Sequence, residues 1–103
     1  MKVEFAFDTM AIEQQGRTLD DVYYTIKKLF EKYGLPCVSD DDILAFEDTG
    51  RKNDFANMWL AIVALLKADW FVQWASSCTW YEEDGTQEDV LSQAWKFREQ
   101  KRA

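Results

Sequence analysis

The sequence predicts one α+β domain spanning residues 1–103. Three observations support this prediction. The first residues alternate between apolar and polar, two long segments repeat apolar residues at helical spacing, and short runs rich in aromatic or β-branched residues lie between turn residues. A chain of 103 residues, of which 48% are hydrophobic, has the size and composition to bury a core.

The chain opens with a strand pattern. Val3, Phe5 and Phe7 alternate with polar or small residues, which is the period of two of a half-buried β-strand. The polar segment after Phe7 contains Gly16 and is predicted to be a loop.

A capped amphipathic helix is predicted next. Thr18 is its expected N-cap, and acidic residues follow in the first turn, where the helix dipole favours them. Gly34 and Pro36 are expected to end it. Its apolar side recurs at intervals of three and four residues and consists of Leu19, Val22, Tyr23, Ile26, Leu29, Phe30 and Tyr33.

A β-hairpin is predicted after this helix. Cys37 and Val38 form its first strand, Ser39–Asp42 supply the turn, and Ile43–Glu47 form the second strand. The three adjacent aspartates of the turn lack the ligand spacing of a calcium loop, so a solvated tip is expected rather than a metal site.

A second long helix is predicted from Asn53 or Asp54 to about Ala75, because no Gly or Pro interrupts this segment. Apolar residues occupy nearly its whole circumference, which predicts burial on more than one side. Trp70 and Trp74 continue its buried stripe. Trp70, Val72 and Trp74 also occupy every second position, as apolar residues do in a strand. A strand at this point therefore stays open as an alternative.

The last third of the chain predicts a strand, a turn and a helix. Cys78–Glu82 is rich in strand-favouring residues, and Glu83–Gly85 is typical of a turn. Thr86 is the expected cap of a final helix, whose apolar side includes Trp95 and Phe97.

The predicted order is therefore β-α-β-β-α-β-α. Its first six elements match a ferredoxin-like βαββαβ arrangement, in which two helices cover one face of an antiparallel sheet. The last element would be an additional C-terminal helix, packed on the open sheet face or on a second chain.

Charge and composition argue against several classes of function. A net charge of −7 disfavours direct binding to nucleic acid or to acidic membranes. The N-terminus does not resemble a signal peptide, and the longest apolar run is too short to span a membrane. Two widely spaced cysteines favour reduced thiols in the cytoplasm over a disulfide or metal site.

Catalytic motifs are missing from the sequence. There is no histidine, the commonest general base, and no glycine-rich phosphate loop or nucleophile elbow. We therefore expect a protein that is not an enzyme and that uses no cofactor. Both cysteines are interpreted as small buried hydrophobic residues.

The abundance of aromatic residues favours a protein–protein contact. Sixteen per cent of the chain is Phe, Trp or Tyr, and a small domain leaves some of these residues exposed. We expect a homo-oligomer or a contact with another protein. The candidate interaction residues are Trp70, Trp74, Trp80, Tyr81 and Trp95.

Two other functions stay open. The acidic clusters at residues 40–42, 47–48 and 82–84 could make the chain a decoy that inhibits a nucleic-acid-binding protein. A pocket between the long helix and the sheet could instead bind a small ligand.

The stretches NDFANMWLAIVALLKADWF and SCTWYEEDG carry a resemblance to known proteins. They are similar to small uncharacterised proteins of gut Firmicutes, members of a domain family of unknown function, some of them encoded on mobile elements. The resemblance implies a bacterial cytoplasmic protein and no particular activity, cofactor or partner.

Overall fold

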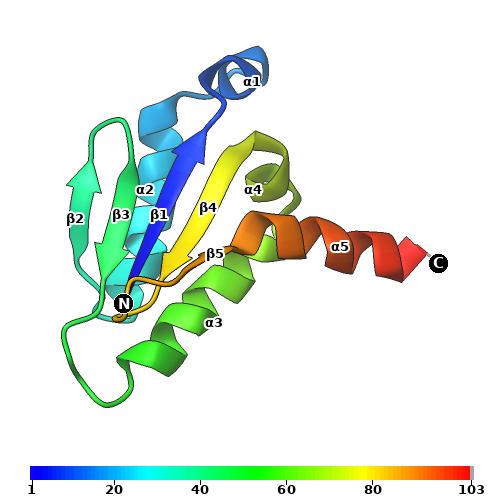
Figure 1. The fold of residues 1–103 in the computed structure, drawn as a ribbon. Coiled ribbons are helices and arrows are strands. Elements are labelled where there is room, and N and C mark those ends of the chain that lie inside the picture. The colour runs from blue at the N-terminus through cyan, green and yellow to red at the C-terminus, as the bar shows by residue number, and fades with distance from the viewer. Residues whose placement is uncertain (103) are drawn as a thin grey trace.

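The computed structural model describes residues 1–102 of the chain and the side chains of residues 1–96. It shows a mixed α+β fold with a five-stranded antiparallel sheet and five helices in this part of the chain (Figure 1). The strands are β1 (Lys2–Phe7), β2 (Cys37–Asp40), β3 (Leu44–Glu47), β4 (Ala75–Tyr81) and β5 (Gln87–Asp89). The helices are α1 (Thr9–Gln14), α2 (Leu19–Lys32), α3 (Asp54–Leu66), α4 (Asp69–Trp74) and α5 (Val90–Arg102).

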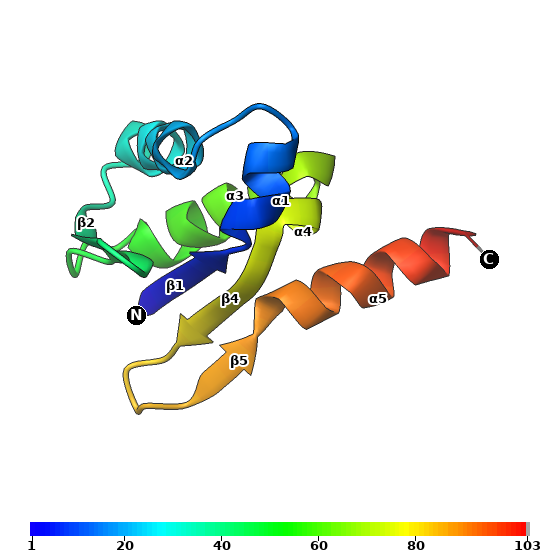
Figure 2. The same cartoon turned by 90° about the horizontal axis from the view of Figure 1, so that it is seen from above.

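The sheet has the order β2-β3-β1-β4-β5, with β1 in the centre. β1 pairs antiparallel with both β3 and β4, which confirms the predicted first strand and the hairpin of β2 and β3. Val3 and Phe5 are fully buried beneath the helices, whereas Glu4 points to the other face. Figure 2 shows α2 and α3 on the same face of the sheet, while α5 extends away beyond β4.

Aromatic residues fill the space between this sheet face and the helices. Phe5 on the central strand packs edge-on against Phe30, Phe46 and Phe71, with ring centroids 5.7–6.2 Å apart. Edge-to-face contacts at these distances are the preferred geometry for aromatic pairs. The predicted alternation of β1 therefore places Phe5 at the centre of the core.

Helix α2 has the predicted boundaries. The Thr18 hydroxyl accepts a hydrogen bond from the amide of Asp21 at 3.2 Å, as expected of an N-cap. At the other end, Gly34 adopts a φ of 72°, and the amide of Leu35 donates to the carbonyl of Phe30 at 3.1 Å. This is the Schellman ending that a glycine permits.

The segment predicted as a loop after β1 contains the short helix α1. The Asp8 carboxylate caps it by accepting from the amide of Ala11 at 3.2 Å. Ile12 is its fully buried residue and anchors it on the core. Six residues with a single buried position are too few to show helical periodicity, which is why the sequence does not reveal this helix.

The predicted continuous helix up to Ala75 is wrong, because the chain forms two helices separated at Lys67 and Ala68. Ala68 is extended, with φ −84° and ψ 120°, and the chain changes direction there. The break lets Phe71 pack edge-on against Phe5 and become fully buried. Tertiary packing, and not a local helix breaker, sets this boundary. Trp70 and Trp74 are helical, so the alternative of a strand is excluded.

The predicted helix cap at Thr86 is also wrong. Residues 87–89 form strand β5, which pairs with β4, and α5 begins only at Val90. The Asp89 carboxylate accepts from the amide of Ser92 at 3.0 Å and supplies the cap instead. The predicted apolar position Phe97 lies outside the residues whose side chains are described.

Candidate functional site

The five predicted interaction residues do not form one surface. Trp70 and Trp74 lie side by side on α4, Trp80 lies in the core, and Tyr81 and Trp95 lie elsewhere on the sheet and on α5. Their role in binding stays a prediction. The structure instead presents two separate candidate sites, a cleft at α4 and the outer surface of α3.

Trp80 contributes no surface to a contact, because its side chain is fully buried. Trp59 of α3 stacks on it at 4.8 Å, and Phe55 meets it edge-on at 5.9 Å. Its indole nitrogen donates to Glu82 Oε1 at 2.8 Å. A buried indole with its N–H satisfied holds α3 on the sheet.

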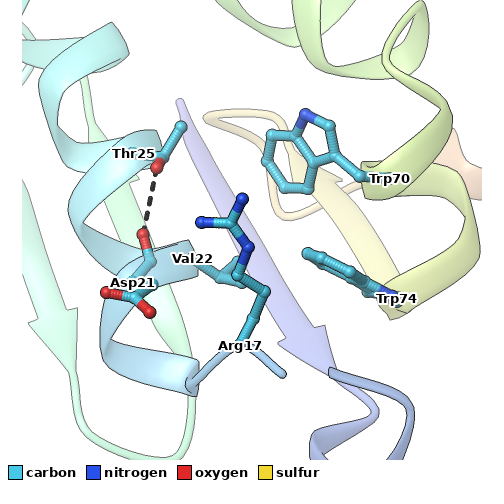
Figure 3. A pocket seen from close by; sticks show the side chains of 6 residues that line it. All are labelled: Arg17, Asp21, Val22, Thr25, Trp70 and Trp74. Atoms are coloured by element: carbon cyan, nitrogen blue, oxygen red, sulfur yellow. Dashed lines mark hydrogen bonds between the residues drawn. The ribbon is translucent and has the colours of Figure 1, made fainter. Parts of the chain in front are cut away.

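Trp70 and Trp74 line an open cleft between α4 and the first half of α2 (Figure 3). The two rings lie 5.9 Å apart with a tilt of 50°. Val22 is the buried residue of the cleft, whose volume is about 230 Å³. The complete lining is Arg17, Asp21, Val22, Thr25, Trp70 and Trp74.

Two backbone features place the walls of this cleft. Gly16, with a φ of 73°, ends α1 in a Schellman motif, in which the amide of Arg17 donates to the carbonyl of Ile12 at 3.2 Å. This bond fixes the backbone of Arg17 beside α2. On the opposite wall, the amide of Asp8 donates to the carbonyl of Trp74 at 2.8 Å and holds the end of α4 against the end of β1.

Arg17 is the cationic side chain of the cleft. Figure 3 shows it between Asp21 and the two indoles, with its guanidinium directed between Thr25 and Trp70. The guanidinium has no hydrogen-bond or ion-pair partner within residues 1–96, and Asp21 lies beyond ion-pair distance. The Thr25 hydroxyl donates to the carbonyl of Asp21 at 3.0 Å. Sequence reasoning missed Arg17, because a single arginine in a loop carries no pattern.

Tyr81 and Trp95 lie apart from this cleft. The Lys2 ammonium sits 5.0 Å from the centre of the Tyr81 ring, and hydrogen bonding to Glu4 raises the pKa of the Tyr81 hydroxyl. Trp95 is 47% exposed and lies at a groove between β4, β5 and the start of α5. Within residues 1–96, no ring contact joins Tyr81 or Trp95 to another tryptophan.

The outer surface of α3 is the second candidate site, and the predicted residues do not include it. Phe55, Leu60 and Val63 are 51%, 55% and 40% exposed, and Ala56 and Ala64 are exposed beside them. We call these five residues the α3 outer face. The sequence signal was present, because residues 55–66 contain no charged residue although 30% of the chain is charged.

The prediction that this helix is buried on more than one side is wrong for the single chain. The inner side of α3 is buried through Met58, Ala61, Ile62 and Leu65. No element in the described part of the chain covers the outer face. An exposed apolar surface of this kind is typical of a contact with another protein.

The acidic clusters lie at two ends of the sheet. The aspartates of the β2–β3 turn are at one end, and Glu82–Asp84, in the β4–β5 turn, are at the other (Figure 1). Glu47 and Asp48 lie near the second group, where the N-terminal ammonium pairs with Asp48 at 2.9 Å. These carboxylates therefore form separate patches and not one continuous track.

Metal and thiol chemistry find little support in the geometry. Within the described residues, no three Cys, Asp or Glu side chains are arranged to hold a metal ion. Burial raises the pKa of the Cys78 thiol to about 12, which opposes formation of a reactive thiolate. Cys37 is exposed, contrary to the expectation of a buried residue, and its thiol donates to the carbonyl of Ser39 at 3.3 Å.

Comparison with known proteins adds no relative: no protein-family model, curated protein or solved structure matches this chain. In the described residues, no helix has the length and apolar character needed to cross a membrane.

Proposed function

We propose that this chain is a cytoplasmic, non-enzymatic interaction module that self-associates through the α3 outer face. The observation that carries the proposal is the exposure of Phe55, Leu60 and Val63 on a helix segment without charged residues. Removing such a surface from water contributes about 25 cal/mol per Å² of apolar area. The unpaired state of both cysteines supports a reducing compartment.

A second copy is the partner that this surface fits best. Ala56, Leu60 and Ala64 follow one another at intervals of four residues, so the pattern reads the same in both directions from Leu60. Two antiparallel copies related by a two-fold axis at Leu60 would place each alanine opposite the other alanine of the partner. Rows at this spacing form the ridges of the commonest helix packing, and a two-fold contact must be self-complementary.

Charge favours this face over the rest of the surface. With a net charge of −7, two copies repel each other at most orientations. The α3 outer face contains no carboxylate, so contact there brings no acidic side chains together. A helix of 13 residues is about 20 Å long, which is short for a stable interface. We therefore expect a reversible dimer that depends on concentration.

We also infer that β1–β4, α2 and α3 form a ferredoxin-like unit. The order β2-β3-β1-β4 and the antiparallel pairing of β1 with both neighbours support this interpretation. β5 and α5 would then be additions at the β4 edge, and α1 and α4 short insertions beside β1 and β4. In this arrangement α3 is one of the two helices that cover the sheet, which leaves its outer face available to a partner.

Analytical ultracentrifugation at several concentrations tests the self-association. The wild-type chain should change from monomer to dimer with increasing concentration, and Leu60→Glu should remain monomeric. Tyr24→Glu is the matched control, because Tyr24 is a similarly exposed residue on α2 and the variant adds the same charge. High salt should leave the dimer intact, because salt screens charge pairs and not apolar contacts.

Three outcomes would overturn the proposal. A wild-type chain that stays monomeric through the micromolar range removes self-association. Equal loss of the dimer in Leu60→Glu and Tyr24→Glu would mean that added charge, and not the α3 outer face, controls assembly. Dissociation of the dimer at high salt would indicate a contact driven by charge.

A further inference from the structure

We propose that the cleft between α2 and α4 binds a small aromatic carboxylate. The evidence is the juxtaposition of an unpaired guanidinium with two indole rings in a space of about 230 Å³. This inference is independent of self-association, because no residue of the α3 outer face lines the cleft. We call the site the Arg17 cleft.

Arg17 selects the charge of the ligand. Its guanidinium makes no ion pair within residues 1–96, so it is free to pair with the anionic group of a ligand. A guanidinium offers a planar fork of N–H donors that matches a carboxylate in two parallel hydrogen bonds. Its position between Thr25 and Trp70 in Figure 3 leaves these donors directed into the cleft.

Trp70 and Trp74 select an aromatic group. Their rings are tilted by 50° with centroids 5.9 Å apart, so together they form a continuous aromatic wall on the α4 side of the cleft. A planar ring in the cleft can stack on either indole or meet it edge-on, and both arrangements are favourable. Val22 is buried at the cleft and adds an apolar contact.

The remaining groups limit the size and charge of the ligand. Asp21 lies on the other side of Arg17 from the indoles, and its carboxylate opposes a second negative charge on the ligand (Figure 3). The Thr25 hydroxyl already donates its proton to a backbone carbonyl, so it can only accept. The volume lies below the roughly 300–1,000 Å³ of sites for drug-sized ligands, which favours a ligand with a single ring.

Phenylacetate is a suitable probe for the test. In protein labelled with ¹⁵N-tryptophan, each indole N–H gives a separate NMR signal, which single Trp→Phe variants assign. Addition of phenylacetate should shift the signals of Trp70 and Trp74 in a saturable manner and leave those of Trp59 and Trp80 in place. Absence of a saturable shift at millimolar concentrations overturns the proposal.

Two related probes test the chemistry of recognition. Phenylacetamide keeps the ring without the charge, and cyclohexylacetate keeps the charge without the aromatic ring. Both should bind at least several-fold more weakly than phenylacetate. Equal binding of phenylacetamide would contradict the role of Arg17, and equal binding of cyclohexylacetate would contradict the role of the indoles.

Arg17→Gln is the decisive variant. Loss of a hydrogen bond to a charged group should weaken phenylacetate binding by roughly tenfold or more. Lys52→Gln removes the same charge from an exposed position outside the cleft and should bind like the wild type. Arg17 is exposed, so the variant should keep the wild-type dispersion of its other indole signals. Unchanged affinity in Arg17→Gln would overturn the assignment.

Discussion

Helices α2 and α3 cover the same face of one sheet, but the surfaces that they present to solvent differ in chemical character. The outer side of α2 carries charged residues, including Lys27, which pairs with Asp40 at 2.6 Å, and Lys28, which lies 3.8 Å from Glu31. The outer side of α3 is apolar around Leu60 and Val63. The inner sides of both helices are buried in the common core.

This difference shows that the fold requires an apolar inner side on each helix but does not require an apolar outer side. An amphipathic helix such as α2 is sufficient to close the core, because burial of one side stabilises it. Leu60 and Val63 on the outer side of α3 lie outside the core, and exposing them promotes association with other surfaces. The two helices therefore differ in the feature that a partner would recognise.

The largest expected effect tests the two sides of α3. Ile62→Ala on the fully buried inner side should lower the free energy of unfolding by about 2–5 kcal/mol, because it leaves a cavity in the core. Leu60→Ala on the α3 outer face should change it by no more than about 0.5 kcal/mol. Urea denaturation at low protein concentration measures both, since a dimer would add stability to the wild type.

Val22→Ala and Tyr24→Ala repeat this pair on the buried and exposed sides of α2. Val22→Ala should lower the free energy of unfolding, and Tyr24→Ala should leave it nearly unchanged. Of the two exposed variants, only Leu60→Ala should reduce association. If Leu60→Ala destabilised the monomer as much as Ile62→Ala, the α3 outer face would be part of the core and the comparison would fail.

A smaller effect is expected at the N-termini of the two helices. Thr18→Ala removes the hydroxyl that caps α2 and should lower the stability by about 1 kcal/mol. Asn53 stands at the same position of α3 but makes no side-chain capping bond, so Asn53→Ala should cost clearly less. Thermal or urea unfolding of the two variants gives the comparison. Equal losses would mean that both helices depend on their N-cap side chains to the same degree.

The parts of the fold with strong local signals were predictable from the sequence. Alternation revealed β1, and the repeat between Thr18 and Gly34 revealed α2 with both ends. Caps and turns of this kind depend on neighbouring residues alone. The break at Ala68 was not predictable, because neither Gly nor Pro marks it and only the burial of Phe71 requires it.

The candidate sites were predictable only in part. The absence of charge in residues 55–66 was visible, but the sequence does not show which side of α3 the sheet covers. The abundance of aromatic residues made Trp80 a predicted interaction residue, although its position on the inner side of β4 buries it. Arg17 joins Trp70 and Trp74 only through the turn at Gly16 and the packing of α4 beside α2, and both are tertiary features.

The smallest expected effect is a difference in acid sensitivity between the two helix N-termini. α2 is capped by the neutral Thr18, whereas the start of α3 holds the buried carboxylate of Asp54. Asp54 Oδ2 accepts from the Thr49 hydroxyl at 2.7 Å and from the Thr49 amide at 2.6 Å. These bonds hold the pKa of Asp54 below its usual value of 3.8. Nearby, Arg51 Nη2 lies 3.1 Å from Oδ1 and donates to the carbonyl of Gly34 at 2.7 Å.

A lowered pKa in the folded state means that the ionised carboxylate stabilises the fold above about pH 4, and that this contribution is lost as the pH falls through the folded-state pKa. The stability of the wild type should therefore fall more steeply below pH 4 than that of Asp54→Asn, which cannot titrate. Thr49→Val keeps the amide donor and removes the hydroxyl, so its slope should lie between the two. Thr18→Ala should keep the wild-type slope, because a hydroxyl cap does not ionise. Urea denaturation from pH 6 to pH 3 measures the four slopes, and identical slopes for wild type and Asp54→Asn would show that Asp54 does not contribute to the acid response of α3.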